Sequence, residues 1–299
     1  MWNVAQAFFP RSLICLLAIA SVARAADEEA NKRPAEGVQD NSFLIEEAYN
    51  QDPGVVQHIL SITHQVTRVA GPDQREWQFV FTQEWPVFSQ THQLSYTIPY
   101  DYVSIGSDSA HGFDDVLLNY RLQVLTESEA RPAFAPRLSL VLPTGDSDDG
   151  FGNGAVGYQV NLPLSKIVSD RWTLHGNAGA TLVPDVQSHD LVSYNLGASA
   201  IYAVTPTFNL MLESTANWDA EVNERGRTER NLSALISPGV RYAFNHPNDA
   251  QTVIGIAAPI GISSHAPDYG VILTLHSSIS SHARREPSTN DKRVFSSCS

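Results

Sequence analysis

Residues 92–104 read HQLSYTIPYDYVS, and this stretch decides the fold class of the chain. Apolar or aromatic side chains stand at every second position from Leu94 to Tyr102, with polar residues or proline between them. In a β-strand, successive side chains point to opposite faces, so alternation with a period of two gives one apolar and one polar face. The stretch therefore predicts a strand with an apolar environment on one side and water on the other.

The same alternation recurs along most of the chain, interrupted by clusters of Gly, Pro, Asp and Asn that favour turns. Soluble strands usually have ~5 to 6 residues, whereas a tilted membrane-spanning strand needs ~9 to 11. An even number of long strands lets the last pair with the first, which closes a barrel and removes exposed sheet edges. We expect an all-β fold, a closed antiparallel transmembrane β-barrel over residues 55–279. It should have about 12 strands, at residues 55–68, 76–86, 92–104, 113–125, 133–144, 155–166, 171–183, 191–204, 208–218, 230–244, 251–262 and 269–278.

Residues 1–25 have the layout of a secretory signal peptide that directs export through the Sec pathway. A short apolar core is followed by Ala23 and Ala25, which suit cleavage after residue 25. A barrel exported in this way is expected in the outer membrane of a Gram-negative bacterium.

The residues on either side of the barrel are expected to lie outside its wall. Residues 26–54 are predicted as an N-terminal periplasmic segment that contains a short helix or a plug. The helix would cover residues 42–51 and end at Asp52-Pro53-Gly54. Residues 280–299 form a polar C-terminal tail.

The charge of the mature chain narrows the range of partners. Cleavage after residue 25 removes Arg11 and Arg24 and no acidic residue, which leaves 17 Lys and Arg against 32 Asp and Glu, a net charge of −15. Nucleic-acid binding depends on a cationic surface, so this balance argues against it. Cys298 is then the one remaining cysteine, which excludes an internal disulfide. The expected partners are outer-membrane lipid and a small solute, with no cofactor.

Aromatic residues and connection lengths predict the orientation of the barrel. With the N-terminus in the periplasm, the long connections at residues 144–153 and 219–227 lie at the cell-surface end of the barrel. The turn-sized connections at 168–170 and 205–207 lie at the periplasmic end. Aromatic belts at the lipid–water boundary would then use Trp77, Tyr102, Phe113, Trp218 and Tyr269 at the outer ends, and Trp85, Trp172, Tyr202, Phe208 and Phe244 at the inner ends.

Six ionisable side chains are predicted by the alternation to point into the lumen: Glu84, Asp115, Arg121, Arg137, Glu213 and Arg241. Charges that line a pore set its selectivity, so these residues are candidates for contact with a solute. An ion-pair ladder that fills a narrow barrel accounts for them equally well. Both interpretations stay open.

Three stretches resemble a known outer-membrane family. They are SFLIEEAYNQDPGVVQH (residues 42–58), FDDVLLNYR (113–121) and PAFAPRLSLVLPTGD (132–146). They are similar to the transporter-like family named after the meta pathway of phenol degradation, and the similarity extends over nearly the whole mature chain. The resemblance implies a barrel that passes small compounds, apolar or aromatic ones among them. The polar tail after residue 279 departs from the usual aromatic end of the last strand.

Three functions follow from these observations. The first is a passive channel or transporter for small compounds. The second is a structural or interaction barrel whose acidic outer loops bind a partner or lipopolysaccharide. The third is a lipid-acting enzyme that uses His276, whose His-x-Ser spacing is similar to that of outer-membrane phospholipase A, but no orienting acid follows it in strand context. No catalytic site is therefore predicted, and no metal site either, because Gly157 stands where a calcium loop at 146–149 would need its last acidic ligand.

Overall fold

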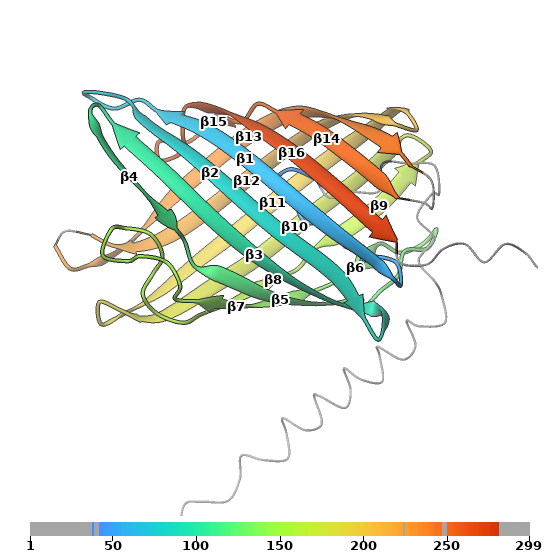
Figure 1. The fold of residues 1–299 in the computed structure, drawn as a ribbon, viewed down its shortest axis with the longest axis horizontal. Helices are drawn as coiled ribbons and strands as arrows, with labels where there is room; N and C mark the ends of the chain where they lie inside the picture. Colours follow the sequence, from blue (N-terminus) through green and yellow to red (C-terminus); the bar gives the residue numbers. More distant parts are fainter. Residues whose placement is uncertain (1–37, 39–41, 224, 247–249, 281–299) are drawn as a thin grey trace, which may run out of the picture.

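The computed structural model describes residue 38 and residues 42–223, 225–246 and 250–280, which form one closed antiparallel sheet (Figure 1). β1 pairs with β2 on one side and with β16 on the other, and β10 pairs with β11, so the described sheet has no free long edge. The strand segments are β1 (Val55–Thr67), β2 (Gln74–Val87), β3 (Ser89–Ile105), β4 (Asp108–Phe113), β5 (Val116–Leu122), β6 (Ala133–Phe134), β7 (Arg137–Leu142), β8 (Gly157–Asn161), β9 (Leu164–Ser169), β10 (Trp172–Val186), β11 (His189–Thr205), β12 (Phe208–Val222), β13 (Thr228–Asn245), β14 (Gln251–Ala257), β15 (Ile260–Gly261) and β16 (Tyr269–Ser280).

Four strands of the barrel are interrupted, so these segments make a closed barrel of 12 strands within the described residues. Three interruptions contain a proline, at Pro136, Pro163 and Pro259. Proline has no N–H to donate to a neighbouring strand, so the ladder breaks there. The fourth falls at Asp114-Asp115, between β4 and β5.

The predicted closed barrel of about 12 strands is confirmed, and most strand bounds agree within a few residues. The largest difference is in the fourth strand, which begins at Asp108 instead of residue 113. Gly106 has φ +62° and sits in the tight turn that joins β3 to β4. Glycine adopts this left-handed conformation without strain, so the chain can turn at Gly106. The fourth strand therefore begins directly after this turn, before the apolar alternation starts.

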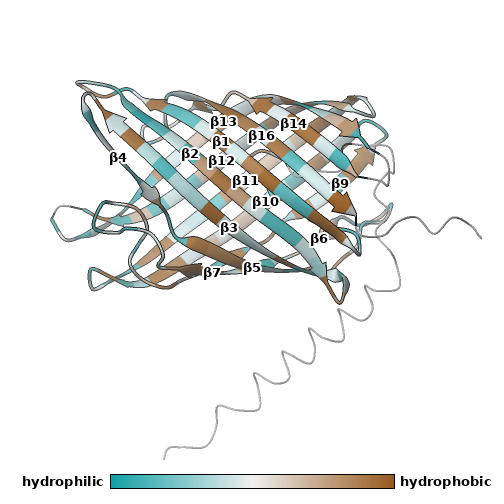
Figure 2. Cartoon of the chain, viewed as in Figure 1, coloured by the Kyte–Doolittle hydropathy of each residue, from teal (hydrophilic) through white to brown (hydrophobic). Residues whose placement is uncertain are grey.

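The two faces of the wall differ as the alternation predicts (Figure 2). On β16, Val271, Leu273 and Leu275 are exposed on the outside, whereas Thr274 and His276 are buried inside. Lipid accepts an extended backbone only when all its hydrogen bonds are made within a closed sheet. An apolar exterior on such a closed sheet is the fold of an outer-membrane β-barrel.

We call the end that carries Val55 and Ser280 the inner end, and the opposite end the outer end. The long connections at 143–156 and 223–227 lie at the outer end, on the left in Figure 1, and the turns at 170–171 and 206–207 lie at the inner end. These four connections differ in length as predicted, but the outer end also has two-residue turns at 106–107 and 187–188, and the inner end has a long connection at 123–132.

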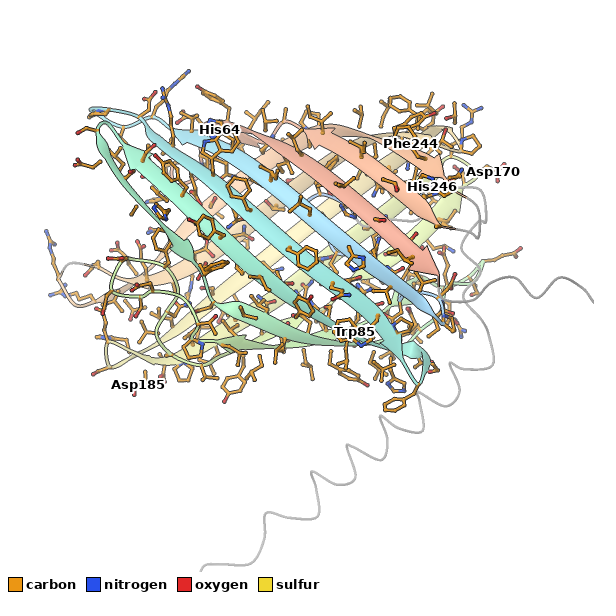
Figure 3. All side chains as sticks on the ribbon, in the orientation of Figure 1. His64, Trp85, Asp170, Asp185, Phe244 and His246 are labelled. Carbon is orange, nitrogen blue, oxygen red and sulfur yellow. The ribbon has the colours of Figure 1, made fainter. Side chains whose placement is uncertain are left out.

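The aromatic residues predicted for the belts stand near the strand ends and on the outside of the wall. Trp85 and Phe244, near the inner end, point away from the lumen (Figure 3). Further rings cover the wall between the belts on β2 and β3: Phe79, Phe81, Tyr96 and Tyr100. The aromatic surface is thus continuous along these two strands and is not confined to the two belts.

The segment at residues 42–54 contains no helix, so of the two predicted forms, a short helix and a plug, the helix at 42–51 is wrong. No stretch of the described residues forms a helix long and apolar enough to cross a membrane. The predicted signal peptide at residues 1–25 and the tail after Ser280 lie outside the described residues.

Candidate functional site

Residues 42–54, which we call the lumen segment, run into the barrel: residues 42–51 are buried or half-buried, and Asp52 and Pro53 are exposed where the segment joins β1. Ala48 and Asn50 are 0% and 1% exposed. The backbone of the segment bonds to inward-pointing side chains of the wall: the Asn50 N–H donates to Gln123 Oε1 (3.1 Å), and the Gln51 N–H donates to Gln93 Oε1 (2.7 Å). A helix this short is marginal by itself, and here wall side chains bind the backbone groups that a helix would have paired.

Arg121, on β5, binds more of the lumen segment than any other wall residue named here. Its guanidinium donates to Asn50 Oδ1 (2.8 Å), to the Glu47 carbonyl (3.1 Å) and to the Tyr49 carbonyl (2.9 Å). It also forms ion pairs with Glu46 (3.2 Å) and with Glu84 of the wall (3.8 Å). The planar fork of five N–H donors suits such a cluster of acceptors.

Glu46 is the acidic partner on the lumen segment. Its carboxylate accepts hydrogen bonds from Arg137 Nε (2.9 Å) and Asn161 Nδ2 (2.7 Å), in addition to the ion pair with Arg121. Burial raises the pKa of the Glu46 carboxyl, but the charges of Arg137 and Arg121 and these hydrogen bonds outweigh it and hold the pKa below its ordinary value. Glu46 is therefore ionised at neutral pH.

Glu213 and Arg241, two of the predicted lumen residues, lie at the start of the lumen segment. Both are almost fully buried, with 1% and 2% exposure. The Leu44 N–H points at both oxygens of the Glu213 carboxylate (3.3 and 3.4 Å). Glu213 thus binds the segment's backbone rather than lining an open pore.

Glycines in the wall make room for two apolar side chains of the lumen segment. A Cβ at Gly239 would lie 2.7 Å from the ring of Phe43, and one at Gly255 would lie 2.5 Å from it. A Cβ at Gly197 would collide with Ile45 Cδ1. The wall is therefore shaped to the segment as well as hydrogen-bonded to it.

Ser165, His175 and Glu47 meet where β9 and β10 face the lumen segment. Ser165 Oγ lies 2.7 Å from His175 Nδ1, and His175 Nε2 lies 3.7 Å from Glu47 Oε1. The order matches a nucleophile, a base and an acid, but Ser165 is 1% exposed and its Oγ accepts the Ala48 N–H (2.8 Å). A buried hydroxyl engaged in this way anchors the segment and has no access to a substrate.

The long inner connection also binds the lumen segment. Glu127 accepts hydrogen bonds from the Tyr49 hydroxyl, from Lys166 Nζ (3.1 Å) and from the Ile167 N–H (2.7 Å). This contact joins the 123–132 connection, the segment and β9 at the inner end.

Asp115, at the outer end, has a different role. Its carboxylate accepts the Gly145 N–H (3.1 Å) and the Asn153 N–H (2.8 Å), and so draws the 143–156 connection inward. Phe151 of that connection is buried against Gly112. Asp115 therefore anchors a loop.

The six predicted residues all point into the interior, but they do not form one site. Arg121, Arg137, Glu84 and Glu213 gather around the lumen segment, with Arg241 near Glu213, while Asp115 holds the outer connection. Their direction followed from the alternation. Sequence reasoning missed their partners on the segment, above all Glu46 and Asn50, because residues 42–54 show no period from which contacts could be inferred.

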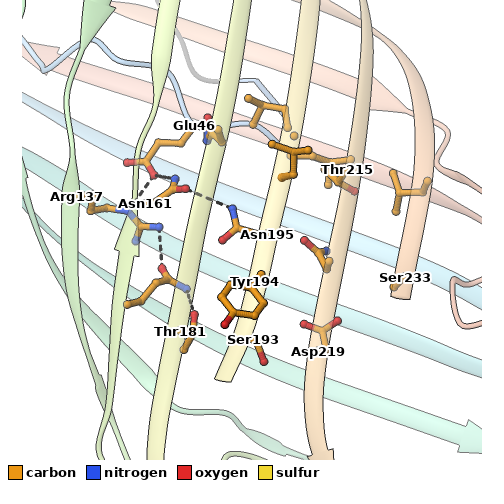
Figure 4. A pocket seen from close by; sticks show the side chains of 18 of the residues that line it. Glu46, Arg137, Asn161, Thr181, Ser193, Tyr194, Asn195, Thr215, Asp219 and Ser233 are labelled. Carbon is orange, nitrogen blue, oxygen red and sulfur yellow. Dashed lines mark hydrogen bonds and ion pairs between the residues drawn. The ribbon is translucent and has the colours of Figure 1, made fainter. Parts of the chain in front are cut away.

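A cavity of about 620 Å³ occupies the outer half of the lumen, beyond the lumen segment (Figure 4). Leu44, Ile45 and Glu46 form its floor, and inward side chains of the wall form its sides. Asn161 of the wall donates to Glu46 of the floor, and along the wall Arg137 donates to Gln159, which in turn donates to Thr181.

No metal site takes shape among the described residues, and His276, the residue of the candidate enzyme site, does not face lipid. No group of three or more His, Cys, Asp or Glu side chains there is arranged to hold a metal ion. His276 is 3% exposed and points into the barrel interior, and Ser278 donates to the Gln251 carbonyl of the neighbouring strand (3.3 Å).

Comparison with one solved structure supports the fold. The COG4313 outer membrane channel from Pseudomonas putida F1 superposes with a TM-score of 0.60 at 15% identity, covering 81% of this chain and 98% of that one. The KdgM porin has a TM-score of 0.44 at 9% identity, with 75% and 99% covered, and the NanC porin 0.42 at 9%, with 73% and 98% covered. No curated protein matches the chain.

A family model settles the relationship of the sequence. The model described as the MetA-pathway of phenol degradation matches residues 44–271, which include most of the lumen segment and nearly all of the barrel. The chain therefore belongs to the family of the MetA-pathway of phenol degradation.

Proposed function

We propose that the protein is a passive outer-membrane channel for small solutes, and that the lumen segment closes its inner half. The observation that carries the proposal is that the lumen segment occupies the inner half of the lumen without being part of the wall. Hydrogen bonds, ion pairs and apolar contacts hold the segment in place. Such contacts can be broken and reformed, so displacement of the segment would connect the outer cavity with the inner end.

The solute expected from the resemblance is small, with apolar or aromatic compounds included. The interior supports a narrower proposal, because carboxamide, hydroxyl and charged side chains provide most of its surface. Apolar solutes gain little from such a lining, since their burial would leave its polar groups without water. We therefore propose that the channel passes polar solutes.

A second function, a structural barrel without transport, is favoured by the density of contacts around Arg121. One guanidinium there binds four residues of the lumen segment and one of the wall. A network of this kind could hold the segment in place permanently.

Swelling of liposomes that contain the full chain distinguishes the two functions. For a channel, neutral polar solutes should enter and swell the liposomes, slowly for the wild type and faster for Arg121→Ala, which loosens the lumen segment. Arg230→Ala, on the outer part of β13, should match the wild type. Liposomes that stay unswollen with both the wild type and Arg121→Ala would contradict the channel and support the structural barrel.

A further inference from the structure

Most of the polar side chains that line the cavity in the outer half of the lumen are carboxamides and hydroxyls. Carboxamide and hydroxyl side chains from both sides of the barrel face it: Gln65, Gln78, Asn177, Ser193, Asn195 and Asn217. Carboxamides donate and accept hydrogen bonds, and so do hydroxyls. A ligand whose groups also donate and accept would match this lining.

The charges at the cavity nearly cancel. Glu46 and Arg137 at the floor form an ion pair of 2.9 Å, and Arg137 donates three further hydrogen bonds, to Asn119, Ser139 and Gln159. Asp219 is a further lining residue and is exposed. Among the described lining residues, no cation is left to attract an anion, and one carboxylate repels it.

The lining also offers no ring on which an aromatic solute could stack. Tyr194 contributes to the lining, but its side chain is 47% exposed on the outside of the wall, where the Arg230 guanidinium lies 5.0 Å from the ring centre. The apolar part of the floor comes from Leu44 and Ile45.

Asn177, on β10, marks where a ligand would bind. It is 6% exposed, and its Oδ1 has no hydrogen-bond partner among the described residues. A buried acceptor without a partner costs about 1 to 3 kcal/mol, so a hydroxyl donated by a ligand would be favourable there.

We propose that this cavity is a binding site for an uncharged, hydroxyl-rich solute of one or two rings. Its volume of about 620 Å³ lies within the range of ~300 to 1,000 Å³ found for pockets that bind small molecules. The site rests on the proposed channel function in one respect, that the bound solute would be the cargo.

Titration calorimetry of the full chain in detergent tests the site, with sucrose as the probe and phenol and gluconate as comparisons. Sucrose should bind saturably, and phenol and gluconate should not. Asn177→Leu should weaken sucrose binding about tenfold, the effect of losing one hydrogen bond to a buried group. Asn231→Leu, an amide outside the cavity, should leave it unchanged.

Should Asn177→Leu not fold, Asn217→Leu serves as a second variant and should also weaken sucrose binding. Absence of saturable sucrose binding would overturn the site, as would tighter binding of phenol or gluconate than of sucrose. Calorimetry in detergent measures binding independently of transport. A barrel that conducts and does not bind sucrose would overturn the site alone, whereas a barrel that binds sucrose and never conducts would support the site and contradict the channel.

Discussion

The inner and outer halves of the lumen are built from the same strands and yet differ in what their polar side chains contact. In the inner half, Arg121, Gln123 and Ser165 bind the lumen segment. In the outer half, residues such as Asn177 and Asn217 face a cavity of about 620 Å³.

The difference shows that alternation determines where polar groups point, but not which groups satisfy them. Buried polar groups need partners whatever their source. A segment of the same chain provides them in the inner half, and water or a solute must provide them in the outer half. The inner half should therefore respond strongly to substitution, and the outer half weakly.

Loss of Arg121 should have the largest effect on the inner half. Arg121→Ala leaves the carboxylates of Glu46 and Glu84 without this partner and removes three further hydrogen bonds to the segment. Breaking a buried ion pair costs about 3 to 5 kcal/mol. Hydrogen exchange at residues 44–51 should therefore become much faster, and it should stay as in the wild type for Arg230→Ala. Unchanged protection in Arg121→Ala would show that the segment is held by other contacts.

A methyl group at Gly197 should loosen the segment less. Gly197→Ala collides with Ile45 and with no backbone atom closer than 3.4 Å, so Ile45 must move, at a cost of about 1 to 3 kcal/mol. Chymotrypsin should then cleave after Tyr49 faster than in the wild type. Gly176→Ala is the matched control, because its Cβ would meet nothing closer than 3.8 Å. Equal rates of cleavage in the two variants would show that the fit of Ile45 against Gly197 does not hold the segment.

Acid should weaken the inner contacts through Glu46. Because its pKa in the folded protein lies below the ordinary 4.5, its ionisation stabilises the docked segment above pH 4.5. This contribution is lost as the pH falls through the lowered pKa, when Arg137 and Arg121 lose their charged partner. Ionic current through a planar bilayer should rise below pH 4.5, and Glu46→Gln should remove that rise. A rise that persists in Glu46→Gln would assign it to another group.

Substitution in the outer half should have the smallest effect on stability. The Asn217 side chain faces the cavity and has no hydrogen-bond partner among the described residues, so Asn217→Leu should change the free energy of unfolding by less than about 0.5 kcal/mol. Urea unfolding in detergent measures it. A loss as large as that of Arg121→Ala would mean that the two halves do not differ in the way described.

The barrel could be predicted because the sequence pattern that specifies it is local and is repeated in each strand. Each long strand carries the same period of two, so a break at Pro136 or Pro163 shifts a strand end without changing the topology. Glu84 and Arg121, which the same period predicts to point inward, are 8% and 2% exposed.

The lumen segment could not be predicted in this way. Its contacts join residues far apart in the chain, 91 positions for Glu46 and Arg137 and 169 for Leu44 and Glu213. Its sequence resembles the start of a helix, because Ser42 followed by Glu46 and Glu47 suits a helix N-terminus. Inside the barrel, wall side chains offered better partners to the backbone than a short helix could.

Closure of the inner half by residues 42–54 is the central claim, and ionic current through single barrels in a planar bilayer tests it most directly. The full-length chain at neutral pH should give little or no steady current, and a chain that lacks residues 42–51 should give a large and steady one. Equal currents through the two barrels, or no current through either, would contradict the claim.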